Sequence, residues 1–280
     1  MSGHPHINTE ETIAILTDVT KCVGCQKCVV ACVEENQTGD PVPYIYSHPD
    51  GLSGSRWTSV LKIQDRFVRK QCVHCVDPSC QSACLVGALK KQPNGAVTYD
   101  AKKCIGCRYC MISCPFTIPR YQWDTWMPFV RKCILCSGKT NHPEAEGRLQ
   151  EGKQPACTGA CPYGATISGT RKEMLEEAAR RLKESPDKYI PRIWGEHDYG
   201  GTNVLYISDV PLEELGFPKS RDTKWEKISI PSANMPVVMA TPFIFVSVMG
   251  GSVSWILSRR MKLAAERKKL KESEQSGERE

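Results

Sequence analysis

Sixteen cysteines in this 280-residue chain constrain its fold more than any other feature, because all of them lie between Cys22 and Cys161 in four motifs of four. Two motifs have the spacing CxxCxxCxxxC, one lengthens the gap between its second and third cysteines, and one places a 20-residue segment before its third. In chain order, the motifs are Cys22, Cys25, Cys28 and Cys32; Cys72, Cys75, Cys80 and Cys84; Cys104, Cys107, Cys110 and Cys114; and Cys133, Cys136, Cys157 and Cys161.

A disulfide scaffold is disfavoured, because such scaffolds are short secreted chains that begin with a signal peptide. The N-terminal residues contain neither a basic start followed by an apolar stretch nor a twin arginine, so we expect no export leader. A 40% hydrophobic content indicates a folded chain, and a net charge of +6 is too mild to require a nucleic-acid partner.

The motif spacing predicts four [4Fe–4S] clusters, each of which needs four thiolates, one per iron. In two-cluster ferredoxins the first three cysteines of a motif hold one cluster and the fourth holds the other cluster. We therefore predict crossed ligation in four groups. Group A is Cys22, Cys25, Cys28 and Cys161; group B is Cys32, Cys133, Cys136 and Cys157; group C is Cys72, Cys75, Cys80 and Cys114; and group D is Cys84, Cys104, Cys107 and Cys110.

Zinc is the alternative metal, and zinc sites would indicate an interaction module instead of an electron carrier. Four-cysteine zinc sites use two CxxC pairs separated by a longer stretch, and three closely spaced thiolates crowd one face of a tetrahedral ion. Colour separates the two hypotheses, since a cluster protein is brown with absorbance near 400 nm and a zinc protein is colourless.

Repeated flanking residues predict the local structure around the motifs. An aspartate, Asp18 or Asp100, follows an apolar run and precedes a first cysteine by four residues, which indicates a strand, a turn and a cluster loop. Gly87 and Gly164 follow fourth cysteines and indicate a turn back into a strand. We expect the Pro- and Gly-rich segment 36–65 to be a surface loop.

Three further segments have distinct patterns. Residues 137–156 are polar and without periodicity, so we expect a solvated loop or a docking surface. Residues 171–184 have the apolar spacing of an amphipathic helix that packs on the core, with Thr170 and Glu173 as its capping box. Residues 201–210 are predicted to form a strand involved in subunit contact.

Residues 237–257 contain 21 consecutive residues without a charge. A helix of that length spans roughly 30 Å, the thickness of the hydrocarbon core of a bilayer. Within 20 residues of the span, seven basic residues follow it and four precede it. The positive-inside rule therefore places the C-terminus in the cytoplasm and the cysteine-rich part on the periplasmic side. Because no leader is visible, we expect this part to be exported with a partner that bears the signal.

The segments KQCVHCVDPSC, CIGCRYCMISCPFTIP, YGATISGTRKEML and YGGTNVLYISDVPLEELGFP resemble the four-cluster electron-transfer (beta) subunits of membrane-bound respiratory oxidoreductases. The chain is most similar to the iron–sulfur subunit of periplasmic uptake [NiFe] hydrogenase, and it also resembles the beta subunit of nitrate-inducible formate dehydrogenase. The resemblance covers about residues 12–260. It implies a position between a catalytic subunit, of hydrogenase or molybdenum/tungsten-pterin formate dehydrogenase type, and an integral quinone-reactive subunit, either a b-type cytochrome or haem-free.

We therefore predict an α+β protein with two nested bacterial-ferredoxin-like units and long inserts, followed by a single C-terminal transmembrane helix in the inner membrane. The parts are an outer unit at 1–40 and 125–200, an inner unit at 66–122, an extension at 201–235, a transmembrane helix at 236–258 and a basic tail at 259–280.

No catalytic motif is present, and all sixteen thiols serve as ligands in this interpretation, so we expect an electron-transfer subunit that is not an enzyme by itself. A soluble cytosolic ferredoxin-like carrier is the alternative.

The span contains no histidine, so its helix alone cannot ligate a haem by imidazole. His74 either tunes a cluster or is exposed. Four basic residues beside cysteines are candidate tuners: Lys103, Arg108, Arg131 and Lys132.

Overall fold

The computed structural model describes residues 8–38, 50–121, 129–138 and 146–219, together with four residues near the C-terminus. Residues 1–232 and 233–280 form two separate units. In the second unit, Trp255, Ser258, Arg259 and Met261 are helical, and the Arg259 guanidinium stacks 5.4 Å from the Trp255 ring centroid.

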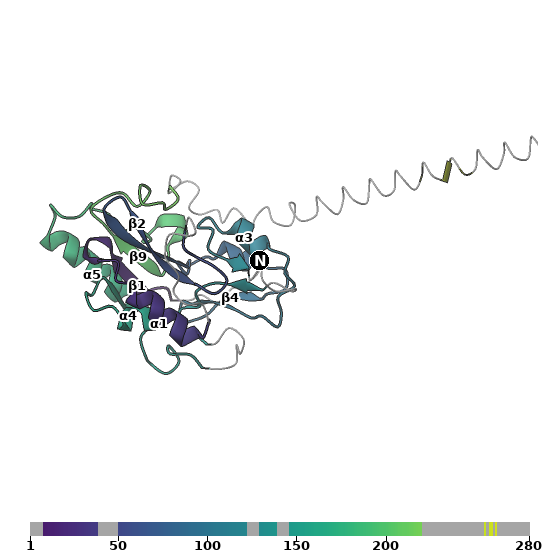
Figure 1. The fold of residues 1–280 in the computed structure, drawn as a ribbon, viewed down its shortest axis with the longest axis horizontal. Coiled ribbons are helices and arrows are strands. Elements are labelled where there is room, and N and C mark those ends of the chain that lie inside the picture. The colour runs from purple at the N-terminus through teal and green to yellow at the C-terminus, as the bar shows by residue number, and fades with distance from the viewer. Residues whose placement is uncertain are drawn as a thin grey trace, which may run out of the picture. The chain divides into compact units, whose positions relative to one another are not determined.

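A three-stranded sheet in the order β8-β1-β9 supports the first unit (Figure 1). Its central strand β1 (Ile13–Asp18) pairs antiparallel with β8 (Thr166–Thr170) and parallel with β9 (Val204–Ile207). The helix α5 (Arg171–Glu184) covers one face of the sheet, and the cysteine-rich core covers the other. Both faces of β1 are therefore buried, which explains its nearly continuous apolar sequence.

The amphipathic helix predicted at 171–184 is confirmed as α5. Thr170 Oγ1 accepts a hydrogen bond from the Glu173 backbone N–H, and the Glu173 carboxylate accepts one from the Thr170 N–H at 2.8 Å. This capping box satisfies donors that the first helical turn leaves free. Met174 and Ala178 point inward against β1 and β9, as the four-residue spacing predicted.

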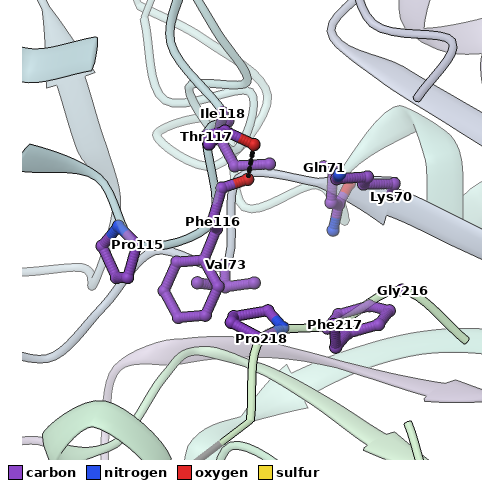
Figure 2. A pocket seen from close by; sticks show the side chains of 10 residues that line it. All are labelled: Lys70, Gln71, Val73, Pro115, Phe116, Thr117, Ile118, Gly216, Phe217 and Pro218. Carbon is purple, nitrogen blue, oxygen red and sulfur yellow. Dashed lines mark hydrogen bonds between the residues drawn. The ribbon is translucent and has the colours of Figure 1, made fainter. Parts of the chain in front are cut away.

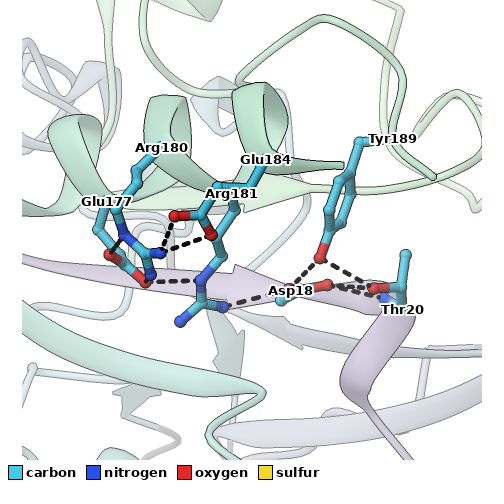
Figure 3. A network of polar contacts seen from close by, with 7 residues as sticks. All are labelled: Asp18, Thr20, Glu177, Arg180, Arg181, Glu184 and Tyr189. Atoms are coloured by element: carbon cyan, nitrogen blue, oxygen red, sulfur yellow. Dashed lines mark hydrogen bonds and ion pairs between the residues drawn. The ribbon is translucent and has the colours of Figure 1, made fainter. Parts of the chain in front are cut away.

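Polar contacts attach α5 to the end of β1 (Figure 3). The fully buried Asp18 accepts hydrogen bonds from the Thr20 N–H, the Tyr189 hydroxyl and the Arg181 guanidinium. A 3₁₀ turn (Val19–Lys21) follows, so Asp18 caps the turn that leads into Cys22. The predicted strand and turn before Cys22 are confirmed.

The first and fourth motifs meet through their helices. The helix α1 (Lys27–Asn36) carries Cys28 and Cys32 and packs against α4 (Ala156–Gly159), which carries Cys157 (Figure 1). A left-handed turn at Gly164 then returns the chain into β8, as predicted.

The second and third motifs form a smaller subdomain with its own apolar core. The helices α2 (Ser79–Ser82) and α3 (Tyr109–Ser113) pack together beside the hairpin of β4 (Leu89–Lys91) and β5 (Val97–Tyr99). Strands β6 (Arg120–Tyr121) and β7 (Val130–Arg131) pair next to it. The repeated Asp100 and Gly87 signals are confirmed here, since Asp100 follows β5 and a left-handed Gly87 precedes β4.

The prediction that 36–65 is a surface loop is wrong for its described second half. The strand β2 (Thr58–Ile63) pairs over its full length with β3 (Arg66–Gln71). Trp57 and Leu52 are each 5% exposed and pack into the central core. The strand forms because Trp57 is buried and β3 pairs with it. The Pro- and Gly-rich residues that precede the strand favoured the loop prediction.

The extension predicted from residue 201 begins inside the fold. β9 completes the main sheet, and the residues just before it hydrogen-bond to the loop of the second motif: the Val76 N–H donates to Gly201 O at 2.9 Å and the Asn203 N–H to Val73 O at 3.0 Å. The segment thus joins the inner motifs to the outer sheet.

Within the described residues, no helix combines the length and apolar character that crossing a membrane requires. Apart from Trp255, the span predicted at 237–257 lies outside those residues.

Candidate functional site: four groups of thiols

Group B is the most deeply enclosed set of thiols. Its four members, Cys32, Cys133, Cys136 and Cys157, line one cavity, whose other walls include Ile15, Trp57 and Leu135. Burial raises the pKa of Cys32 well above its usual value, and the thiols of the three other members raise it further. The structure therefore brings together one cysteine of the first motif and three of the fourth.

Groups C and D show the same exchange between motifs. Burial raises the pKa of Cys75 strongly, and the next contributions come from Cys114, Cys72 and Cys80. Burial likewise raises the pKa of Cys110 to about 12, followed by contributions from Cys107, Cys104 and Cys84. Cys114 thus interacts with the first three cysteines of the second motif, and Cys84 interacts with Cys110 of the third.

Group A lies nearer the surface. Burial is the main cause of the raised pKa of Cys22, and among the thiols the largest contribution comes from Cys161. Cys25 is exposed, as is Cys107 in group D, whereas every thiol of group B is buried.

The four groups adjoin one another in a single order. Thiols of neighbouring groups interact electrostatically at three places: Cys28 with Cys157, Cys133 with Cys72, and Cys80 with Cys110. The order is therefore A, B, C, D, with the exposed thiols Cys25 and Cys107 in the two end groups.

The loops that carry the first two cysteines of each motif share one backbone feature. The residue before the second cysteine is left-handed in all four motifs, with φ of +72° at Gly24, +71° at Gly106, +49° at His74 and +60° at Leu135. Glycine adopts this conformation without steric cost. At Gly24 an added Cβ would also lie 2.4 Å from the Phe67 ring, so this position has no room for a side chain.

Several groups donate hydrogen bonds to the sulfurs. The backbone N–H groups of Ala88 and Leu135 donate to Cys84 Sγ at 3.1 Å and Cys133 Sγ at 3.4 Å. The Asn36 amide donates to Cys32 Sγ at 3.6 Å. Asn36 was not predicted from the sequence, although it lies four residues after Cys32 and therefore on the same helical face.

Buried cationic side chains lie near the thiols of groups B and C. Of the four predicted tuners, only Lys132 is buried, and its Nζ lies 3.8 Å from Cys72 Sγ. Arg69 and Lys91 are also buried, and neither was predicted from the sequence. Nearby thiols, Cys157 first, raise the pKa of Arg69 against the opposing effect of burial, whereas burial lowers the pKa of Lys91 to about 8.

These cations fit an anionic cofactor. Arg69 donates to the neutral oxygens of Thr58, Thr166 and Gln71, and in the described part of the chain no carboxylate forms an ion pair with Arg69, Lys91 or Lys132. Buried charges require compensation. Four thiolates around an iron–sulfur core would supply buried negative charge where these cations lie.

Across the described ranges, no three Cys, His, Asp or Glu residues close together as they do around one metal ion. A cubane cluster binds each of its four thiolates through a separate iron.

An open pocket of about 250 Å³ adjoins group C (Figure 2). Its lining is mostly apolar, and Lys70 contributes a cation. The apolar side chains include Val73, Phe116, Ile118, Phe217 and Pro218. Pro115 and Val73 directly follow the ligand candidates Cys114 and Cys72, so the pocket approaches this group from the surface.

Comparisons with known proteins agree with this geometry. Residues 63–171 match the model of a 4Fe–4S dicluster domain. The chain is 39% identical to the hydrogenase-2 operon protein HybA of Shigella flexneri over 251 residues, which cover 75% of this chain and 74% of that protein.

Two formate dehydrogenase subunits are also similar. The nitrate-inducible iron–sulfur subunit of Escherichia coli is 36% identical over 225 residues, 74% of this chain and 72% of its own. The iron–sulfur subunit of Haemophilus influenzae is 33% identical over 244 residues, 79% and 75% of the two chains. The predicted resemblance is confirmed: the chain belongs to the family of iron–sulfur electron-transfer subunits that includes these hydrogenase and formate dehydrogenase proteins.

Proposed function

We propose that the protein holds four [4Fe–4S] clusters and relays single electrons through them between a catalytic subunit and a quinone-reactive membrane subunit. The gathering of sixteen thiols into four groups, each composed of three cysteines from one motif and one from another, supports this proposal most directly. The nested arrangement of two ferredoxin-like units follows from the same exchange of fourth cysteines.

The clusters, when bound, supply one-electron exchange. The chain's own residues hold them and adjust their surroundings. Cysteines on α1 to α4 and in the adjoining loops provide the thiolates, and the apolar walls around group B exclude water. Buried cations and N–H donors beside sulfur favour the additional negative charge of the reduced state.

The order of the groups gives the proposed relay two ends. Group A and group D each adjoin only one other group through the thiol interactions above, and each carries an exposed cysteine. Exposed apolar side chains lie around both: Val23 and Tyr163 at group A, and Ile105, Ile112 and Leu85 at group D. Apolar residues that remain exposed beside a redox site are typical of a protein interface.

The relatives suggest which proteins dock there. One is named as a hydrogenase-2 operon protein and another as the iron–sulfur subunit of a formate dehydrogenase. We propose that one end of this chain meets a [NiFe] hydrogenase or molybdenum/tungsten-pterin formate dehydrogenase type of subunit. The other end meets an integral quinone-reactive subunit, either a b-type cytochrome or haem-free.

The proposed location is the inner membrane, with the cluster-bearing part on the periplasmic side and the basic tail in the cytoplasm. The uncharged sequence 237–257 and the excess of basic residues after it support this orientation. Protease added to the outer face of spheroplasts should digest the cluster-bearing part, and protection of that part would contradict the orientation.

Anaerobic purification of the native complex tests the main proposal. We expect about sixteen irons and sixteen inorganic sulfides per chain, one of each for every proposed thiolate ligand, together with brown colour. Nickel in a co-purifying subunit identifies a hydrogenase, and molybdenum or tungsten identifies a pterin enzyme. Far fewer irons in a fully loaded sample, or a colourless protein containing zinc, would contradict the cluster proposal, and solubility without detergent would contradict the membrane location.

A further inference from the structure

His74 lies between groups B and C, where Cys133 and Cys72 interact. Its side chain belongs to the loop of the second motif and is fully buried. Its Nε2 lies 3.4 Å from Sγ of Cys133, 59 residues further along the chain. The imidazole therefore connects the loop that carries Cys72 and Cys75 with a thiol of the neighbouring group.

A backbone group determines which imidazole nitrogen carries the proton. The Val97 N–H donates to His74 Nδ1 at 2.9 Å. Nδ1 must therefore be the unprotonated acceptor, and the neutral ring carries its proton on Nε2. This tautomer directs an N–H donor at Cys133 Sγ, the geometry required for an N–H···S hydrogen bond.

Loop packing alone does not require an imidazole at this position. The equivalent residues in the other motifs are Gly24, Gly106 and Leu135, and all four are left-handed. Leu135 shows that a buried apolar side chain also fills such a site.

Lys132 places a positive charge at the same junction. Its Nζ donates to the carbonyl oxygens of Val97 and Cys133 and lies 3.8 Å from Cys72 Sγ. The residue is 3% exposed, so little water screens its charge from the thiols. Val97 thus contacts both polar groups, with its N–H on His74 and its C=O on Lys132.

We propose that His74 and Lys132 raise the reduction potentials of the two clusters that meet at this junction, His74 through Cys133 in group B and Lys132 through Cys72 in group C. The proposal rests on the function proposed above. Reduction adds one negative charge to a cluster, and both an N–H···S bond and a nearby cation stabilise that charge. Both residues are positioning residues, because they act through the ligand thiols.

Potentiometric titration of the native complex, followed by electron paramagnetic resonance, tests the proposal with the variant His74→Leu. This change installs the side chain that the chain itself uses at 135. We expect all sixteen irons to remain and the group B cluster to become about tenfold harder to reduce, which lowers its potential by roughly 59 mV for one electron. The matched control His197→Leu removes a side chain that is 81% exposed and should leave every potential unchanged.

Lys132→Met should lower the potential of the group C cluster most, and Lys132→Arg, which keeps the charge, should restore much of it. Labelling the wild-type histidines with ¹⁵N gives a readout that needs no variant. We expect hyperfine coupling from one histidine nitrogen to a reduced cluster, and its loss in His74→Leu.

Unchanged potentials in both variants, or no ¹⁵N coupling in the fully loaded wild type, would overturn this inference while leaving the relay intact. Loss of four irons in His74→Leu would indicate a structural role if the wild type also lacks the coupling. An iron content far below sixteen in the wild type would instead contradict the proposed function.

Discussion

The guanidinium of Arg181 lies 3.1 Å from the buried carboxylate of Asp18, 163 residues earlier in the chain. The Tyr189 hydroxyl donates to the same carboxylate at 2.9 Å. Because Asp18 ends β1 four residues before Cys22, this contact positions the first cluster loop against α5 (Figure 3).

We expect Asp18→Asn to destabilise the protein by about 2–3 kcal/mol, since it removes the charge opposite a mostly buried arginine. The cost stays below that of a fully broken buried pair because Glu177 still pairs with Arg181 at 2.7 Å. The loaded complex should lose its absorbance near 400 nm at a temperature at least about 4 °C lower. Arg180→Ala removes only an exposed arginine and should leave this temperature nearly unchanged, and an equal effect of both changes would contradict this account.

Gly24→Ala should destabilise the loop of group A more than Gly164→Ala does. Both glycines are left-handed, so the backbone strain of about 1–2 kcal/mol is similar in the two variants. Only at Gly24 does the new Cβ meet a side chain, the Phe67 ring, whereas nothing lies within 4 Å at Gly164. Thermal unfolding of the loaded protein measures the difference, and Phe67→Ala should recover part of the loss in the Gly24→Ala background.

Crossed ligation predicts which cysteine variants alter the same cluster. Cys114→Ser should alter the same paramagnetic signal as Cys75→Ser, and Cys84→Ser should alter the same signal as Cys107→Ser. The reason is that each fourth cysteine lies with the first three of the other motif. If Cys114→Ser and Cys107→Ser affect one signal instead, each motif closes on its own cluster.

A charge introduced at either proposed end of the relay should weaken the binding of a different partner subunit. Ile112 is 81% exposed beside Cys110, and Val23 is 48% exposed beside Cys22. Ile112→Glu should weaken co-purification with one partner subunit, and Val23→Glu with the other, because each places a carboxylate in an apolar contact. Iron content should remain unchanged in both, and two variants that release the same partner would contradict the assignment of separate ends.

Local signals in the sequence were reliable where the structure they specify is also local. Thr170 and Glu173 predicted the start of α5 correctly because both partners of a capping box lie within one helical turn. Asp18 and Asp100 likewise marked the turns after β1 and β5. Cysteine spacing indicated the chemistry because a cluster loop needs its first thiolates at short intervals.

Signals that depend on distant residues were missed or misread. Segment 36–65 was predicted as a loop, yet β2 forms because β3 pairs with it and the core accepts Trp57. Lys91 was not singled out, although its ammonium is buried and donates to the carbonyl oxygens of His74, Cys75 and Gly95. Neither outcome follows from neighbouring residues, because the partners belong to other strands and loops.

The sequence by itself determined the type of cofactor chemistry, the number of thiol motifs and the helical and turn elements that surround them, because cysteine spacing and capping are local properties. Only the tertiary structure decided that β9 completes the main sheet, that the thiol groups adjoin in the order A to D, and that His74 faces Cys133. These relationships join segments tens of residues apart, and chain folding, not spacing, sets the distances between them.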